Sequence, residues 1–299
     1  MPVQPQKQSA TTTPSNRTPT SKSNSLLDRI TPVSKQVDSG MIVNFYGRNG
    51  SGKTTLSCTF PKPLLIVGLE DGTRSVRNVP GVDFLHVDSS ADLIELTQLI
   101  RDDKTATVYK SIVVDTATSL QDMVLKEVLN LEELPVQLAW GTVTQNQYRQ
   151  RSEKTKELLR PFLDIGRRTT KNVIILAQEK NHSAKDGEGS GDSEILVPFV
   201  GSSIGASVCG WLQDNCDFIC QTYTRELVES KEVTIGTGTN AKKTIVSNKT
   251  GKVEFCLRTQ RAHPVYAAKM RVDKNVELPD MLSSPTYEKL LTIINGKKG

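Results

Sequence analysis

The sequence predicts an α/β fold in which helices flank a mainly parallel central sheet that carries an antiparallel extension. A glycine-rich loop, residues 47–55, stands between an apolar strand and a helix. Further apolar strands then alternate with segments whose apolar residues recur at helical spacing, which is typical of a parallel sheet with helical crossovers. Beyond residue 217 extended runs dominate instead. This change predicts the antiparallel extension.

The strands and helices follow from the period of the apolar residues. Apolar, buried strands are expected at 41–46, 63–68, 110–116 and 172–178, and a short strand is expected at 82–87. Helices are expected at 56–60, 91–102, 120–131, 146–167, 203–212 and 287–294. Extended segments are expected at 217–223, in two runs within 233–258 and at 265–271. Pro161 is expected to kink the long helix, because proline removes a backbone donor.

Composition divides the 299 residues into an arm, a core domain and a tail. Residues 1–38 are rich in Ser, Thr and Pro and lack periodicity, which predicts disorder. Residues 39–275 form one α/β domain, and residues 276–299 form a C-terminal helix and tail. The net charge is +5, of which +3 lies in residues 1–39 with five Lys/Arg against two Asp. The core is thus almost neutral, which permits a local nucleic-acid groove but does not require one.

No apolar run reaches the length of a membrane span, and the first thirty residues lack a signal core. We therefore expect a cytoplasmic protein without a membrane partner. The five cysteines have irregular spacings and form no CxxC pair, so they predict free buried thiols rather than a zinc site. They are Cys58, Cys209, Cys216, Cys220 and Cys256.

The glycine-rich loop predicts a polyphosphate site. Glycines at 47, 50 and 52 allow positive φ, so backbone N–H groups can turn inward as an anion nest at a helix N-terminus. Lys53 would reach the β- and γ-phosphates, and the Thr54 hydroxyl would bind Mg²⁺. We therefore expect ATP and Mg²⁺ as ligands. The predicted nucleotide-binding residues are Gly47, Arg48, Asn49, Gly50, Ser51, Gly52, Lys53, Thr54 and Thr55.

Carboxylates at neighbouring strand ends predict the chemistry around that site. Asp115 ends an apolar strand and is the expected second Mg²⁺ group. Because Thr116 follows it, no adjacent acid can activate water. Glu70, at the end of strand 63–68, is the expected base, and Asp71 remains the alternative.

Three further residues are expected to act on the nucleotide. Gln178, at the tip of strand 172–178, would sense the γ-phosphate and pass its presence to the Gly/Ser-rich loop at 180–203. Lys269 and Arg271 alternate with Met270 on a terminal strand, so both would face one side and reach the nucleotide of a neighbouring subunit. A charged edge strand that prevents aggregation is the alternative for this pair.

These segments together resemble the RecA-like branch of P-loop ATPases over residues 40–275. The matching segments are GRNGSGKTT (Walker A), LEDGTR with Glu70, SIVVDT (Walker B), NVIILAQ with Gln178, and AKMR with the two cations. The motif sequences are most similar to those of the RecA-like single-strand annealing proteins of phages. The resemblance implies a homo-oligomer with nucleotide at subunit interfaces, in a bacterial or phage-infected cell.

The resulting hypothesis is an ATPase that binds single-stranded DNA and promotes annealing or recombination with slow ATP hydrolysis. The alternative is a nucleotide-controlled scaffold or loader of a DNA-processing complex without significant catalysis. A small-molecule kinase is disfavoured because no arginine-rich lid is seen. Loop 180–203 mixes both charges, so DNA contacts by other basic residues are expected. Those residues are Arg149, Arg151, Lys154, Lys156, Arg167, Arg168 and Lys171.

Overall fold

The computed structural model describes residues 40–70, 72–101, 108–134, 143–182, 198–235 and 242–296. The chain divides into two units, residues 1–38 and residues 39–299. The predicted arm, Asp71 and the 183–197 part of the predicted loop therefore lie outside the described residues.

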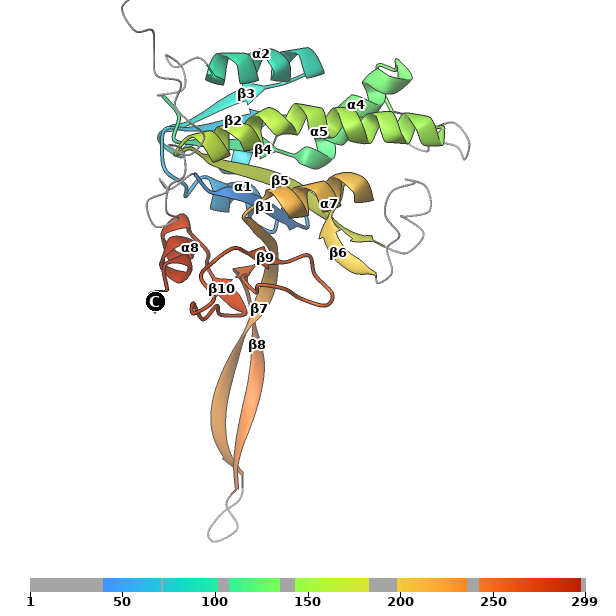
Figure 1. Ribbon diagram of the computed structural model, residues 1–299. Helices are drawn as coiled ribbons and strands as arrows, with labels where there is room; N and C mark the ends of the chain where they lie inside the picture. Colours follow the sequence, from blue (N-terminus) through green and yellow to red (C-terminus); the bar gives the residue numbers. More distant parts are fainter. Residues whose placement is uncertain are drawn as a thin grey trace, which may run out of the picture. The chain divides into compact units, whose positions relative to one another are not determined.

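One sheet organises this unit (Figure 1). Its parallel strands are, in spatial order, β3 (Val82–His86), β2 (Leu64–Gly68), β4 (Ser111–Asp115), β5 (Asn172–His182), β1 (Ile42–Gly47) and β7 (Phe218–Ile235). Antiparallel strands β8 (Lys242–Arg258) and β10 (Met281–Ser283) continue beyond β7. The short antiparallel strands β6 (Phe199–Ser202) and β9 (Lys269–Met270) pair with β5 and β7. The predicted mainly parallel sheet with an antiparallel extension is confirmed.

Helices cover both faces of the sheet (Figure 1). On one face lie α2 (Ser90–Arg101), α4 (Ala117–Leu129), α5 (Gln145–Arg168) and α7 (Ala206–Asn215). On the other lie α1 (Lys53–Ser57) and α8 (Tyr287–Ile294), and a 3-10 turn spans Thr73–Ser75. Side chains alternate across each strand, so Ile42 and Tyr46 of β1 join the first core, whereas Val43 and Phe45 join the second. Burial on both faces of β1, β2 and β4 explains why these strands read as continuous apolar runs.

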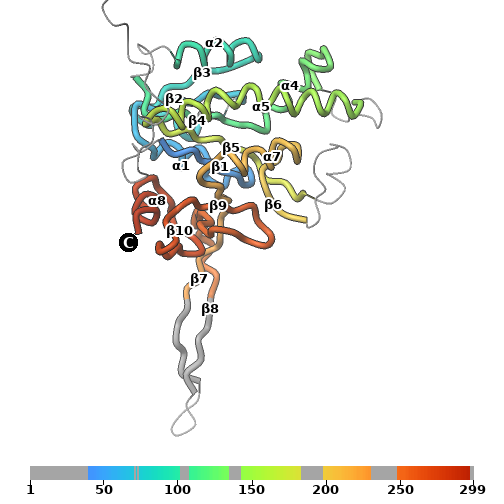
Figure 2. Tube along the Cα trace, viewed as in Figure 1, coloured from blue at the N-terminus to red at the C-terminus, as the bar shows by residue number. Residues whose placement is uncertain are grey.

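Three predicted elements differ from the structure. Strand β5 does not end at Gln178 but continues to His182, because β6 supplies new backbone partners for residues 179–182. The runs at 217–223 and 233–258 belong to one long hairpin of β7 and β8 (Figure 2). Of the strand predicted at 265–271, only Lys269–Met270 pairs as β9. Each difference depends on cross-strand pairing, which local sequence does not encode.

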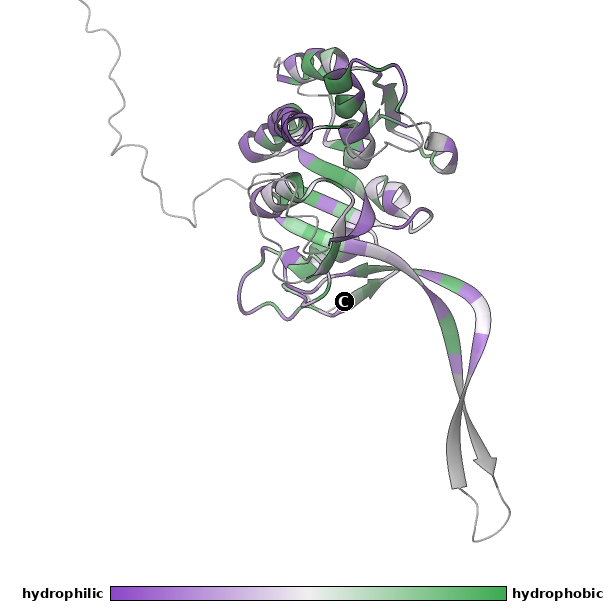
Figure 3. Cartoon of the chain, turned by 90° about the vertical axis from the view of Figure 1, so that its right-hand side faces the viewer, coloured by the Kyte–Doolittle hydropathy of each residue, from purple (hydrophilic) through white to green (hydrophobic). Residues whose placement is uncertain are grey.

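The interior is apolar along the sheet, as the hydropathy colouring in Figure 3 shows. All five cysteines are buried and free, as predicted. Burial raises the pKa of Cys216 and of Cys220 to about 12, so both remain neutral thiols. Within the described part of the chain, no helix has the length and apolar character needed to cross a membrane.

Helix α5 anchors the first core through Phe162, whose side chain is fully buried. Replacing Phe162 with alanine is expected to lower the free energy of unfolding by about 3–5 kcal/mol, because a large cavity replaces the ring. Urea denaturation measures the change. Arg160→Ala, at an exposed position of the same helix, is the control and should change it by less than about 0.5 kcal/mol.

Candidate functional site

The glycine-rich loop lies at the carboxyl end of β1 and leads directly into α1. Gly50 and Gly52 have φ of 76° and 84°, in the left-handed region that favours glycine. Gly47 does not have a positive φ, so the expected reason for that glycine is wrong. A Cβ at Gly47 would lie 2.2 Å from the carbonyl oxygen of Thr222 on β7, so the close approach of the two strands excludes a side chain.

Lys53 turns back over this loop. Its Nζ donates hydrogen bonds to the carbonyl oxygens of Gly47 (2.9 Å) and Arg48 (3.0 Å). The residue is only 8% exposed, and burial lowers the pKa of its ammonium, while the charge of Asp115 opposes that shift. The cation is thus held at the mouth of the loop. This is where a phosphate would supply the missing counter-charge.

Thr54 and Asp115 meet although 61 positions separate them in sequence. The Thr54 hydroxyl donates to Oδ2 of Asp115 at 2.9 Å. Strand β5 lies between β1 and β4, so the carboxyl ends of three parallel strands converge here. Burial raises the pKa of Asp115, and the hydrogen bond from Thr54 opposes that shift. A hydroxyl and a carboxylate in contact form the oxygen donor set that Mg²⁺ prefers, so the predicted metal residues fit the ion.

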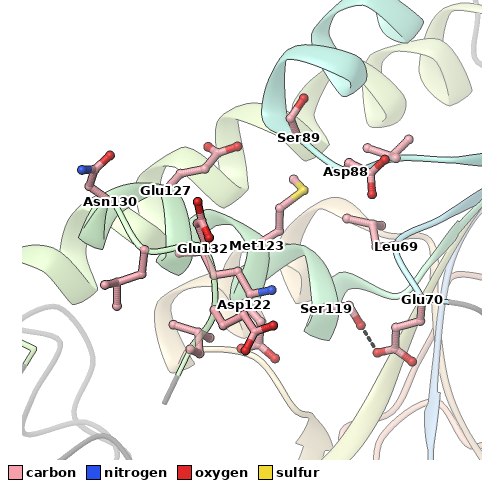
Figure 4. Close-up of a pocket in the computed structure, with 15 residues that line it drawn as sticks. Leu69, Glu70, Asp88, Ser89, Ser119, Asp122, Met123, Glu127, Asn130 and Glu132 are labelled. Atoms are coloured by element: carbon pink, nitrogen blue, oxygen red, sulfur yellow. Dashed lines mark hydrogen bonds between the residues drawn. The ribbon is translucent and has the colours of Figure 1, made fainter. Parts of the chain in front are cut away.

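Glu70 lies just past β2, the strand that pairs with β4. Its Oε1 accepts a hydrogen bond from the Ser119 hydroxyl (Figure 4). Ser119 also bonds Thr116, whose side chain caps the N-terminus of α4. The carboxylate is therefore held at the N-terminus of α4. Asp71, the alternative base, lies outside the described residues.

An acidic groove of about 1080 Å³ extends from Glu70 along α4 (Figure 4). Lys126 is its one cation among the described lining residues. The carboxylates in its lining are Glu70, Asp88, Asp122, Glu127, Glu132 and Glu133. Such a surface repels phosphodiesters, so a nucleic acid would have to bind elsewhere.

Gln178 pairs in register with Gly47, at the level of the loop. Its N–H donates to the Thr118 hydroxyl at 3.1 Å, and its carbonyl oxygen accepts from the N–H of Ser203 at 2.6 Å. The backbone of Gln178 therefore joins the start of α4 to the segment before α7. This position agrees with the sensing role expected for Gln178, which stays a prediction.

Sequence reasoning missed two residues of the site. Ser119 orients Glu70, and Glu179 binds Nε of Arg48 in the loop (2.7 Å) and the amide of Gln221 (3.0 Å). Glu179 was expected to lie past the strand end, in a loop. The signal for Ser119 was its place three residues after the capping Thr116, but its partner lies 49 positions away.

Lys269 and Arg271 do not join this site within one chain. Strand β9 pairs with the start of β7, whereas the glycine-rich loop follows the carboxyl end of β1. Lys269 donates to the carbonyl oxygens at the end of α7, and Arg271 forms an ion pair with Asp217 (2.9 Å). Their expected action on a neighbour's nucleotide stays a prediction.

The predicted basic DNA surface is largely occupied by contacts within the chain. These join Lys154 to Glu127, Lys156 to Glu153 and Ser207, Arg167 to Asn215, and Lys171 to the carbonyl oxygen of Tyr109. Arg149 and Arg168 are exposed. Four of the seven side chains are thus already engaged, so the helix face as a whole is not a free basic patch.

Comparison with known proteins agrees with this geometry. No curated protein matches the chain. A family model described as the AAA domain matches residues 39–271, which include every strand from β1 to β9 and all the site residues above. That match covers more than half of the chain. The chain therefore belongs to the AAA domain family of P-loop ATPases.

Proposed function

We propose that this protein binds Mg²⁺–ATP at the loop between β1 and α1 and slowly hydrolyses it to ADP and phosphate. The observation that carries the proposal is the contact of the Thr54 hydroxyl with the Asp115 carboxylate, beside the buried ammonium of Lys53. Family membership supports it, because AAA domains generally use ATP with Mg²⁺. In this arrangement Lys53 and the loop amides bind the phosphates.

Glu70 is the residue proposed to act on water. Its carboxylate accepts a hydrogen bond from the attacking water and takes its proton, and Ser119 holds the carboxylate in place. Mg²⁺, when held by Thr54 and Asp115, neutralises charge on the β- and γ-phosphates. Because Thr116 supplies no acid beside Asp115, the base comes from the adjacent strand β2.

Phosphate release from ATP tests this function. We expect slow turnover that requires Mg²⁺ and stops when EDTA removes the metal. Thr54 and Asp115 provide ligands for the ion, but neither carries a positive charge that could replace it. Calcium, which prefers longer bonds and more ligands, serves as the comparison ion. Turnover that is equally fast in EDTA would contradict the proposal.

We further propose that nucleotide controls the binding of single-stranded DNA, as expected for an annealing or recombination protein. The supporting observation is a buried cation on α5. Nε of Arg151 is buried without a hydrogen-bond partner in the described residues, and the guanidinium packs over the ring of Tyr148 at 5.0 Å. Burial lowers the pKa of Arg151, and Tyr148 and Asp122 oppose that shift. A buried guanidinium with an unmet donor favours an oxyanion such as a phosphodiester.

Other donors gather around the same place. Gln121 is buried, at 4% exposed, and its Nε2 also lacks a hydrogen-bond partner among the described residues. Its Oε1 accepts a hydrogen bond from the N–H of Gly205. Gly205 is the N-cap of α7, and Lys156 donates to Ser207 in the first turn of that helix. A helix N-terminus, an amide and the guanidinium of Arg151 together suit one phosphate.

The backbone of Gln178 connects this donor cluster with the nucleotide. It bonds Ser203, two residues before Gly205, and Thr118, three residues before Gln121. A shift of Gln178 on ATP binding would therefore move both sides of the cluster. This provides a physical route by which ATP raises DNA affinity.

Arg151→Gln is expected to weaken the binding of a single-stranded oligonucleotide by about tenfold in the presence of Mg²⁺–ATP, because one charge-assisted contact is lost. Filter binding over a salt series measures the affinity, and the slope against salt should become shallower. Arg160→Gln, an exposed arginine on the same helix that is not among the expected DNA contacts, is the matched control. ATP turnover without any DNA binding at low salt would favour the alternative, a nucleotide-controlled scaffold or loader.

The protein is also proposed to act as a homo-oligomer in which Lys269 and Arg271 of one copy reach the nucleotide of the next. Arg271 is exposed, so it can exchange Asp217 for a phosphate without unfolding of β9. Mass measurement with and without ATP and DNA tests the assembly.

A further inference from the structure

An exposed aromatic residue lies against the phosphate loop. Phe255 is on β8, and its Cδ1 is 3.0 Å from the position that a Cβ on Gly52 would occupy. The residue is nevertheless 46% exposed. One edge of the ring thus packs on the loop while much of its surface faces solvent. The open part of the ring is a flat aromatic surface beside the loop that a ligand can contact.

The backbone holds this ring in a defined position. Phe255 pairs with Thr224 on β7, and its carbonyl oxygen accepts from the N–H of Ser284 at 2.8 Å. Two residues along the strand, Leu257 points to the same face and is fully buried in the second core. Phe255 is therefore presented on the α1 side of the sheet by a rigid element rather than by a mobile loop.

The site has a direction that follows from the strand order. Asp115 and Glu70 belong to β4 and β2, which lie on one side of β1, whereas β7 and β8 lie on the other. Mg²⁺ and the lysine contact the β- and γ-phosphates, and the loop amides hold the α- and β-phosphates. The γ-phosphate therefore points toward Asp115 and Glu70. The α-phosphate and the nucleoside must leave on the side of β7 and β8, where Phe255 stands.

We propose that Phe255 stacks against the base of the bound nucleotide and so provides the nucleobase contact of this site. The proposal rests on the proposed function, because it assumes triphosphate in the loop. Bases stack on aromatic rings without needing hydrogen bonds, and the open part of the ring supplies that surface. A larger π-system stacks more strongly, so the contact favours purine over pyrimidine nucleotides.

The test compares ATP with inorganic tripolyphosphate, which carries the same phosphate chain without a nucleoside. Phe255→Ala is expected to raise the Kd of Mg²⁺–ATP by about tenfold, as removal of one stacking ring does, and to leave the Kd of Mg²⁺–tripolyphosphate unchanged. Phe255→Trp should retain ATP affinity. Titration calorimetry measures both ligands, and competition among ATP, GTP, CTP and UTP measures the purine preference, which should shrink in Phe255→Ala.

Val253→Ala is the matched control. Val253 is 60% exposed on the same face of β8, two residues farther from Leu257, and should change neither Kd. Equal weakening of ATP and tripolyphosphate in Phe255→Ala would overturn the proposal, since the ring would then only support the loop. Unchanged ATP affinity would overturn it as well. If the unaltered protein binds neither ligand, the proposed function itself fails, which is a separate result.

Discussion

Replacing Lys53 with alanine is expected to raise the Kd of Mg²⁺–ATP by roughly 100-fold or more, because a buried cation that faces phosphate is lost. The structure gives this lysine no exposed alternative position, since its Nζ is held by the carbonyl oxygens of Gly47 and Arg48. Loss of the ammonium also removes one donor from each of these oxygens, although the Arg48 oxygen still accepts from the N–H of Ser51 at 3.1 Å. Titration calorimetry with Mg²⁺–ATP measures the effect. The affinity for Mg²⁺–tripolyphosphate should fall in parallel.

The control for this change is Lys110→Ala. Lys110 is exposed and precedes β4 at the amino end of the sheet, away from the loop, so its removal should leave the affinity unchanged. Both variants should keep the melting temperature of the unaltered protein to within about 2–4 °C, the shift that a loss of about 1 kcal/mol of stability causes in a domain of this size. A folded Lys53→Ala protein that binds Mg²⁺–ATP as tightly as its parent would refute the proposed site.

The second large effect is expected from Glu70→Gln, which should lower kcat for ATP hydrolysis by about 10²–10⁴-fold while the Kd of Mg²⁺–ATP stays constant. The amide has the same shape as the carboxylate and can still accept the hydrogen bond from Ser119, so the position of the side chain is retained. Only the capacity to take a proton is lost. Single-turnover phosphate release separates this chemical step from binding.

Glu95→Gln is the matched control, because Glu95 is exposed on α2 and contacts no site residue described above. Ser119→Ala provides a finer test. It removes the group that orients Glu70 and should reduce kcat by a smaller factor, with ATP affinity unchanged. Full activity in Glu70→Gln would move the role of base to Asp71, and the Asp71→Asn variant would then carry the loss.

Much of the fold could be predicted because its signals are local. The alternation of apolar strands and amphipathic helices indicates which positions are buried. The loop from Gly47 to Thr55 predicts a phosphate-binding nest from nine consecutive residues. The link between Thr54 and Asp115 was also predictable. Parallel strands bring their carboxyl ends to one edge, whatever their exact order.

Contacts between distant segments could not be predicted in this way. The length of β5 depends on β6, and the continuity of the hairpin depends on pairing between β7 and β8. The sequence also did not indicate which of the seven basic residues assigned to a DNA surface are engaged within the chain, because that depends on burial and on partners from distant segments. Arg151 differs from Lys154 in its surroundings, since Nε of Arg151 has no acceptor among the residues that the structure describes, whereas Lys154 binds Glu127.

The sequence by itself determined that this chain has an α/β core with a glycine-rich loop after its first strand. It also predicted that Lys53, Thr54, Asp115 and Glu70 bind phosphate and Mg²⁺ and act on water. Only the tertiary structure decided that Ser119 holds Glu70 and that Phe255 lies beside Gly52. The physical reason is that backbone conformation and amphipathic period depend on neighbours along the chain. The environment of a side chain depends instead on strand order and on packing between segments more than 200 residues apart.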